Sequence, residues 1–252
     1  MIKVSKIKVM NLEGSFRGMR NPLESWEQSD SYFYSDDSLA NYHCEYREGY
    51  EVKIKEKDMA LAQKLLLAGD DHSKFMRQIF VSMDITAPLY FFKEFDTYKV
   101  GTTANSTSTM HKLAVTPITR ECFSFDNELE FLEDIQQYID DESAYLTFSE
   151  TAIRNCNTLR LKYLETKDIR YWRALIQLLP SSWNQTRTWT ANYQVLRNIY
   201  FARKNHKLQE WKDFCEEIEK LPYAKELFFE GESKEMTKEQ IESALGYRIK
   251  IV

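Results

Sequence analysis

Hydrophobic and polar residues alternate in several short stretches of the chain, and this pattern predicts β-strands. Residues 4–9 alternate apolar side chains with lysines, and residues 79–85 form a second such stretch. Residues 42–56 alternate on both sides of Gly49, which predicts a hairpin with this glycine at its turn. The last residues, 247–252, also resemble a strand. Short strands of this kind predict a small antiparallel sheet.

Apolar residues at helical spacing predict that much of the remaining chain is helical. Residues 56–68 show this spacing, and Gly69 follows as the expected helix end. Pro88 suits the first turn of another helix. Further helices are predicted at residues 126–138, 149–164, 167–179 and 191–221, with a short one after a capping box at Thr237 and Gln240. We therefore predict one α+β domain over residues 1–252, helix-rich with a small antiparallel sheet.

The segment 181–192, SSWNQTRTWTAN, fits two structures. Its hydroxyl residues Thr186, Thr188 and Thr190 alternate as they would along an extended strand. Thr190 also stands where a helix N-cap would stand if the predicted helix at 191–221 begins next to it. We favour the start of a helix, with the strand as the alternative.

Composition and charge exclude several classes of protein. The chain has 252 residues, 43% of them hydrophobic and 29% charged, which is ordinary for a globular protein. A net charge of -5 provides no general attraction to nucleic acid, so none is expected as a partner. The sequence contains no run of about 18 apolar residues, so we expect no membrane span. The amino terminus lacks the apolar core of a signal peptide.

Common catalytic and metal-binding motifs are absent from the sequence. The four cysteines are scattered and form no Cys-x-x-Cys pair: they are Cys44, Cys122, Cys156 and Cys215. We expect them to be reduced thiols in a cytoplasmic protein, without a metal site. The seven glycines form neither a G-x-G-x-x-G fingerprint nor a phosphate-binding P-loop.

Two groups of polar residues are candidates for ligand binding. Residues 102–109 contain seven hydroxyl or amide side chains, which form either a solvated loop or a surface for a polar ligand. In the predicted helix 191–221, Asn192 and Arg203 are eleven residues apart and share the apolar stripe. Polar groups on such a stripe need partners, because leaving one buried and unpaired costs about 1–3 kcal/mol. These partners are either other residues of the protein or a ligand.

Four segments, taken in order, resemble the flavin-dependent thymidylate synthases. They are residues 64–85, 87–111, 178–192 and 192–211. The clearest correspondence is Leu179-Pro180 followed by Trp189-Thr190-Ala191-Asn192, at the interval found in that family. The resemblance spans about residues 61–211, and residues 222–252 are expected to be a C-terminal extension.

The resemblance implies an α+β fold assembled as a homotetramer, with FAD sites formed between subunits. In that family FAD relays reducing equivalents from NADPH, and methylene-tetrahydrofolate supplies the carbon that converts dUMP to dTMP. A pyrimidine nucleotide is therefore the expected substrate, and no membrane partner is expected.

Individual residues correspond to the family's functional positions. By resemblance, the expected cofactor-binding residues are Tyr98, Lys99, Asn192 and Asn198. The expected substrate-binding residues are Glu94, Asn105, Ser108 and Arg203, and Arg203 is also the expected catalytic residue.

The chain departs from the family at several of these positions. The family's Arg-His-Arg triplet is Thr97-Tyr98-Lys99 here, its preceding glutamine is Glu94, and an arginine before the Leu-Pro pair is Ile176. Guanidinium groups are strong ligands for phosphate, so these changes alter the nucleotide half of the site more than the flavin half.

Three hypotheses follow. The chain is a FAD-dependent enzyme that methylates a pyrimidine nucleotide such as dUMP, or a non-catalytic relative that binds a nucleotide or a partner. The third is a structural protein whose cleft is closed by its own aromatic residues.

Overall fold

The computed structural model describes residues 2–33, 52–125 and 148–229. The strands are β1 (Lys3–Met10), β2 (Tyr32–Phe33), β3 (Val52–Lys53), β4 (Phe80–Pro88), β5 (Thr103–Ser106) and β6 (Asn184–Asn192). The α-helices are α1 (Leu12–Gly18), α2 (Glu56–Leu67), α3 (Leu89–Phe95), α4 (Thr109–Lys112), α6 (Phe148–Thr166), α7 (Ile169–Leu178), α8 (Tyr193–Arg203) and α9 (Gln209–Glu219). Single turns are η1 (Asn21–Leu23), η2 (Trp26–Gln28), η4 (Lys74–Gln78), η5 (Arg120–Cys122) and η6 (Lys225–Phe229). The predicted α+β class, helix-rich with a small antiparallel sheet, is confirmed.

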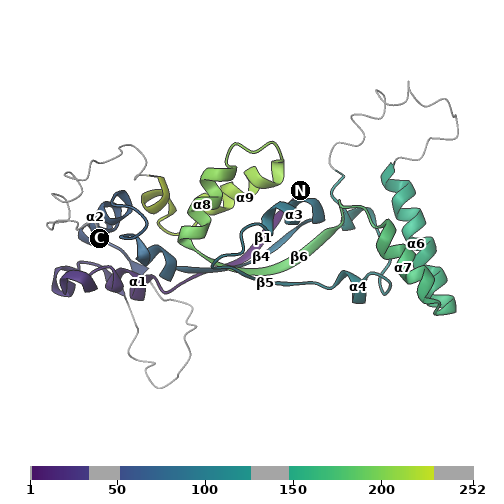
Figure 1. The fold of residues 1–252 in the computed structure, drawn as a ribbon, viewed down its shortest axis with the longest axis horizontal. Helices are drawn as coiled ribbons and strands as arrows, with labels where there is room; N and C mark the ends of the chain where they lie inside the picture. Colours follow the sequence, from purple (N-terminus) through teal and green to yellow (C-terminus); the bar gives the residue numbers. More distant parts are fainter. Residues whose placement is uncertain (1, 34–51, 126–147, 230–252) are drawn as a thin grey trace, which may run out of the picture.

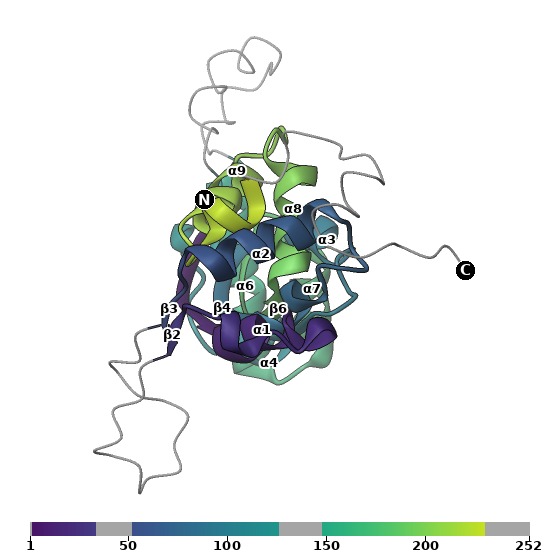
Figure 2. The same ribbon diagram turned by 90° about the vertical axis from the view of Figure 1, so that its left-hand side faces the viewer.

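The centre of the molecule is an antiparallel sheet of four strands in the order β1-β4-β6-β5. The two middle strands, β4 and β6, share the longest run of paired residues. This run extends from Phe80 opposite Asn192 to Pro88 opposite Asn184. Figure 1 shows α3, α8 and α9 on one side of this sheet, α1 and α2 at one end, and α6 and α7 at the other. Figure 2 views the molecule from the α1–α2 end.

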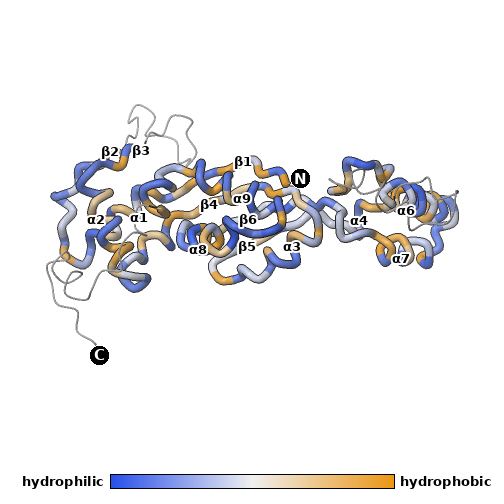
Figure 3. Tube along the Cα trace, turned by 90° about the horizontal axis from the view of Figure 1, so that it is seen from above, coloured by the Kyte–Doolittle hydropathy of each residue, from blue (hydrophilic) through white to orange (hydrophobic). Residues whose placement is uncertain are grey.

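The two faces of the sheet differ in chemistry. Towards the helices, Trp189 of β6 contacts Phe95 of α3 and Phe214 of α9, with ring centroids 4.9 and 6.3 Å apart. Figure 3 shows hydrophobic residues along β4, whereas β6 is mostly hydrophilic. The other face presents small polar side chains, namely Ser82, Asp84, Thr86, Thr186, Thr188 and Thr190. Alternation along both strands therefore places the core on one side only.

A second, smaller hydrophobic cluster lies under α6 and α7. Its buried members are Leu113, Ile118, Phe123, Cys156 and Leu175. The main cluster contains none of these residues and extends from α1 through the sheet to η6. The described part of the chain thus folds around two apolar centres.

Two sequence predictions in the region of α8 are wrong. Residues 181–192 do not begin a helix: residues 184–192 form β6, because the alternating threonines face outwards while Trp189 and Ala191 are buried. The residue that caps α8 is therefore Asn192 and not Thr190.

The predicted helix 191–221 is two helices, α8 and α9. The backbone N–H of Leu208 donates to His206 Nδ1, at 3.2 Å, in the connection between them. This turn lets α9 fold back so that Trp211 packs on Phe91 of α3, with ring centroids 4.6 Å apart. The apolar pattern continues through the connection because Leu208 packs on the core from within it.

Most other predicted elements agree with the structure. The strand at 4–9 is β1, the strand at 79–85 is β4, and the helix at 56–68 is α2, followed by Gly69 at φ +101°. The helices at 149–164 and 167–179 are α6 and α7. In the predicted hairpin at 42–56, Val52–Lys53 form β3, but this strand pairs with Tyr32–Phe33 of β2 and not with residues next to Gly49. Gly49, the helix at 126–138, the capping box at Thr237 and the strand at 247–252 lie outside the described residues.

No helix among the described residues is long and apolar enough to cross a membrane. Within the same residues, no group of three histidine, cysteine or acidic side chains is arranged to hold a metal ion.

A buried ion pair fixes the loop after α1 to the start of α2. Arg20 Nη2 lies 2.5 Å from Asp58 Oδ1, and the two side chains are 4% and 1% exposed. Ser29 Oγ and the backbone N–H of Ser31 donate to Asp58 Oδ2. Burial alone would raise the pKa of Asp58, but the hydrogen bonds from Ser29, Ser31 and Arg20, with the positive charge of Arg20, lower it. The loop is therefore held by a charge with several partners.

We predict that Asp58→Asn destabilises the fold by about 3 kcal/mol, because it leaves Arg20 buried without a counter-charge. The lowered pKa means that the carboxylate stabilises the fold fully above its unfolded pKa near 3.8 and loses this effect as the pH falls further. Urea unfolding of both proteins should therefore show a difference at pH 7 that shrinks below about pH 4. Glu56→Gln, an exposed change on the same helix, is the control, and an equal loss from both variants would contradict the prediction.

Candidate functional site

The junction between β6 and α8 places Asn192 at the base of the candidate site. Asn192 is 8% exposed, and its Oδ1 accepts a hydrogen bond from the backbone N–H of Val195 at 3.0 Å. Gly101 approaches from the loop before β5: a Cβ at this position would lie 3.1 Å from Asn192 Nδ2. Gly101 also has φ +72°, so a glycine is favoured there for both space and conformation. Asn192 therefore caps the helix and packs against the neighbouring loop.

The next turns of α8 hold polar atoms that lack partners among the described residues. Gln194 Nε2 donates to Asn198 Oδ1 at 3.1 Å, but Gln194 Oε1 is buried and unpaired. Arg197 Nε is also buried and unpaired, although its guanidinium lies 5.1 Å from the Phe201 ring centroid. Asn198 itself is exposed. Positions 194, 197 and 198 lie on adjacent turns of one helix, so a hydrogen-bonding ligand could contact all three.

Arg203, at the end of α8, belongs to a cluster that joins three helices. Its Nη1 lies 3.0 Å from Glu94 Oε2 of α3, and its Nε donates to the Tyr98 hydroxyl at 2.9 Å. The guanidinium also lies 4.7 Å from the centroid of the Trp211 ring on α9. The arginine predicted to bind substrate therefore has partners within its own chain.

Glu94 is the centre of this cluster. Besides Arg203, its Oε2 accepts a hydrogen bond at 2.9 Å from the indole N–H of Trp211, which is fully buried. His206 Nε2 lies 3.5 Å from the same oxygen. Since the indole needs an acceptor when buried, Glu94 is also part of the packing of α9.

The remaining predicted site residues lie on the loop after α3 and at the edge of the sheet. Lys99 is exposed beside Tyr98. Asn105 lies on the edge strand β5, is exposed and is in register with Thr188. Ser108 caps α4, where its hydroxyl lies 2.6 Å from His111 Nδ1. The polar run 102–109 is thus largely an edge strand and its continuation.

The structure brings some of the predicted site residues together. Glu94, Tyr98 and Arg203 are in direct contact, whereas Asn192 and Asn198 lie farther back along α8. Among the described residues, Asn105 and Ser108 form no hydrogen bond or ion pair with either group.

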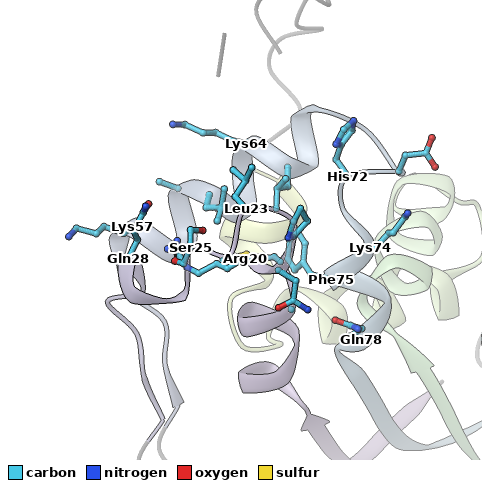
Figure 4. Close-up of a pocket in the computed structure, with 18 of the residues that line it drawn as sticks. Arg20, Leu23, Ser25, Gln28, Lys57, Lys64, His72, Lys74, Phe75 and Gln78 are labelled. Carbon is cyan, nitrogen blue, oxygen red and sulfur yellow. Dashed lines mark hydrogen bonds between the residues drawn. The ribbon is translucent and has the colours of Figure 1, made fainter. Parts of the chain in front are cut away.

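A cavity of about 950 Å³ lies elsewhere, between the loop after α1, helix α2 and η4. Its lining includes the basic residues Lys57, Lys64 and Lys74 together with His72. Phe75 and Leu65 also line it, and its acidic members are Glu27 and Asp71. Figure 4 shows these basic side chains around the cavity, which Arg20 also lines.

No residue that we predicted for the site lines this cavity. Its walls come from the loop after α1, helix α2 and η4. The loop and most of α2 precede the four segments that resemble the family. The signal that could have indicated it is the glycine-to-histidine turn from Gly69 to His72, which lies in the segment similar to the family. The lysines are spread over α2 and η4, and only folding brings them together.

Cysteine chemistry does not contribute to a site among the described residues. Cys122, Cys156 and Cys215 are free. Burial raises the pKa of Cys156, and burial with the nearby charge of Glu219 raises the pKa of Cys215 to about 12. Both buried thiols therefore remain protonated at neutral pH and are weak nucleophiles. Cys44 lies outside the described residues.

The arrangement of strands and helices is the fold of the flavin-dependent thymidylate synthases. No protein-family model and no curated protein sequence matches the chain. Solved structures do match it, and they include thymidylate synthase X (ThyX) from Helicobacter pylori with FAD and dUMP. That structure has 18% sequence identity and a TM-score of 0.58, and the match covers 92% of this chain and 99% of that one.

Two further structures agree. A second H. pylori ThyX complexed with FAD and dUMP has 18% identity and a TM-score of 0.55, over 89% and 98% of the two chains. A UMP/dUMP methylase, PolB from Streptomyces cacaoi, bound with 5-Br dUMP, has 14% identity and a TM-score of 0.51, over 87% and 88%. At these identities the likeness shows the fold, and the sequence-based resemblance is confirmed at that level.

We predict that Asn192→Ala lowers the free energy of unfolding by about 1 kcal/mol, because the Val195 N–H loses its cap. Asn192→Ser keeps a capping oxygen and should recover most of this loss. Thermal unfolding of both variants measures the effect, with Asn205→Ala, an exposed change just after α8, as a control expected to change little. Equal stability of the alanine and serine variants would contradict a capping role.

Proposed function

We propose that this protein binds FAD and a pyrimidine nucleotide and catalyses reductive methylation of that nucleotide, with dUMP as the first candidate. Bound FAD would supply the redox chemistry. NADPH is the proposed reductant and methylene-tetrahydrofolate the proposed carbon donor. The proposal is supported by the fold and by FAD, dUMP and 5-Br dUMP in the similar structures.

The observation that best supports a bound flavin is the pair of unsatisfied buried atoms on α8. Gln194 Oε1 is an acceptor and Arg197 Nε is a donor, and neither has a partner among the described residues. A flavin offers an imide N–H and ribityl hydroxyls to the first, and phosphate or carbonyl oxygens to the second. Buried polar groups are nearly always hydrogen-bonded, so these atoms indicate a partner that is not in the described chain.

Other residues would complete the flavin half of the site. Asn192 and Asn198 are on the same helix, and Tyr98 and Lys99 are on the adjacent loop. Asn105 and Ser108 would bind the nucleotide, together with residues of another copy of the chain. We therefore include a homotetramer in the proposal. Its support is a set of exposed apolar side chains on α6 and α7, namely Leu161, Leu164, Ile169 and Leu178.

The non-catalytic alternative has one specific observation in its favour. Arg203 is the proposed catalytic residue, and in the folded chain its guanidinium is already paired with Glu94. A protein with this pairing could bind flavin and nucleotide without turnover. The two functions differ in product formation and not in binding.

We predict that the purified protein is yellow or becomes so with added FAD, and that Gln194→Leu and Arg197→Gln each weaken FAD binding about tenfold. The reason is that each variant removes a hydrogen bond worth about 1–2 kcal/mol to a buried group. Flavin fluorescence quenching measures the affinity without any turnover. Arg154→Gln, an exposed arginine of α6, is the control for charge. No flavin uptake by the wild-type protein would defeat the proposal.

With FAD, NADPH, methylene-tetrahydrofolate and dUMP, we predict formation of dTMP, measured by chromatography. Arg203→Gln should reduce the rate at least about tenfold while FAD stays bound, because it removes the guanidinium proposed to act on the substrate. Binding of FAD and dUMP without dTMP would reject the reaction and favour the non-catalytic alternative.

A further inference from the structure

Glu94 places a carboxylate against Arg203, the residue that we propose acts on the substrate. The ion pair at 3.0 Å joins residues 109 positions apart in the sequence, and the acceptor oxygen is shared with the buried indole of Trp211. The glutamate is 38% exposed and the arginine 21%, so both groups are accessible at the edge of the cluster. The cluster is therefore a surface site whose cation is already neutralised.

We infer that Glu94 determines ligand specificity by acting as the internal counter-ion of Arg203. An oxyanion that approached the guanidinium would have to displace the carboxylate and would then lie beside it. Like charges held together in this way are strongly unfavourable. The group that a ligand presents to this corner is consequently uncharged, with a hydroxyl or N–H that can donate to Glu94. A phosphate, of the nucleotide or of the flavin, is held elsewhere.

The neighbouring groups support this assignment. Tyr98 accepts from Arg203 Nε through its hydroxyl oxygen and brings no charge. His206, 3.5 Å from Glu94, is the only other titratable side chain placed within ion-pair distance of this carboxylate among the described residues. One carboxylate therefore balances one guanidinium at neutral pH, with the imidazole beside them.

Trp211 makes the substitution Glu94→Gln informative. The glutamine amide oxygen can still accept the indole hydrogen bond, so the packing of α9 should survive, while the negative charge is lost. The inference and the proposed function are tested separately. The probe for the inference is inorganic phosphate, and its binding can be measured without flavin or nucleotide. The inference rests on the proposed function for the presence of a ligand beside Arg203 and for its identity.

The experiment is isothermal titration of inorganic phosphate at low ionic strength. Glu94→Gln should bind phosphate at least about tenfold more tightly than the wild-type protein, because the guanidinium is then free to form charge-assisted hydrogen bonds. The double variant with Arg203→Gln should lose this gain, which assigns it to the guanidinium. Glu216→Gln removes an equal charge from the exposed side of α9 and should show no gain.

Two results would overturn the inference. One is a Glu94→Gln protein that binds phosphate no better than the wild type, although its thermal unfolding transition shows that it is folded. The other comes from the wild-type background and applies even if Glu94→Gln fails to fold: weaker phosphate binding on Arg203→Gln would show that the arginine already accepts anions. Failure of FAD or dUMP to bind would leave these measurements unaffected.

Discussion

The pairing of β4 with β6 is the constraint on which the rest of the structure depends. Nine residue pairs in continuous register join the two central strands. Helix α3 leaves one end of this pair at Pro88, and α8 leaves the opposite end at Asn192. Both helices return over the same face of the sheet, and this brings Glu94 to Arg203. A slip of one residue would turn Trp189 outwards and separate the two helices.

Local patterns in the sequence were sufficient to predict those helices and strands in which the spacing of apolar residues is regular. The helix at 56–68 and the strand at 79–85 are examples, since each combines one clear period with an end signal such as Gly69. The failures have physical causes. In 191–221 the helical spacing of apolar residues continues through the turn at His206, so the sequence does not show where α8 ends. In 181–192 the sequence fits both a helix N-cap and a strand, and only packing against the core selects the strand.

The candidate site was predictable only in part. Asn192 and Arg203 could be selected because polar residues on an apolar stripe need partners, and the resemblance pointed to both of them and to Asn198. The identity of those partners could not be predicted. Glu94 meets Arg203, and lysines of α2 meet His72 across the cavity, only because the sheet and the loop held by Asp58 position segments that are distant in sequence.

The sheet face opposite the helices has a consequence for how this molecule meets its surroundings. Threonine and valine have nearly the same shape, and both favour strands. Valines at these positions would leave the strand backbone unchanged but would create an exposed apolar surface. Each hydroxyl instead donates or accepts as its neighbour requires, as Thr86 and Thr186 do across the strands. The face can therefore exchange its hydration for contact with another polar surface, and back again, without any change in the strands beneath it.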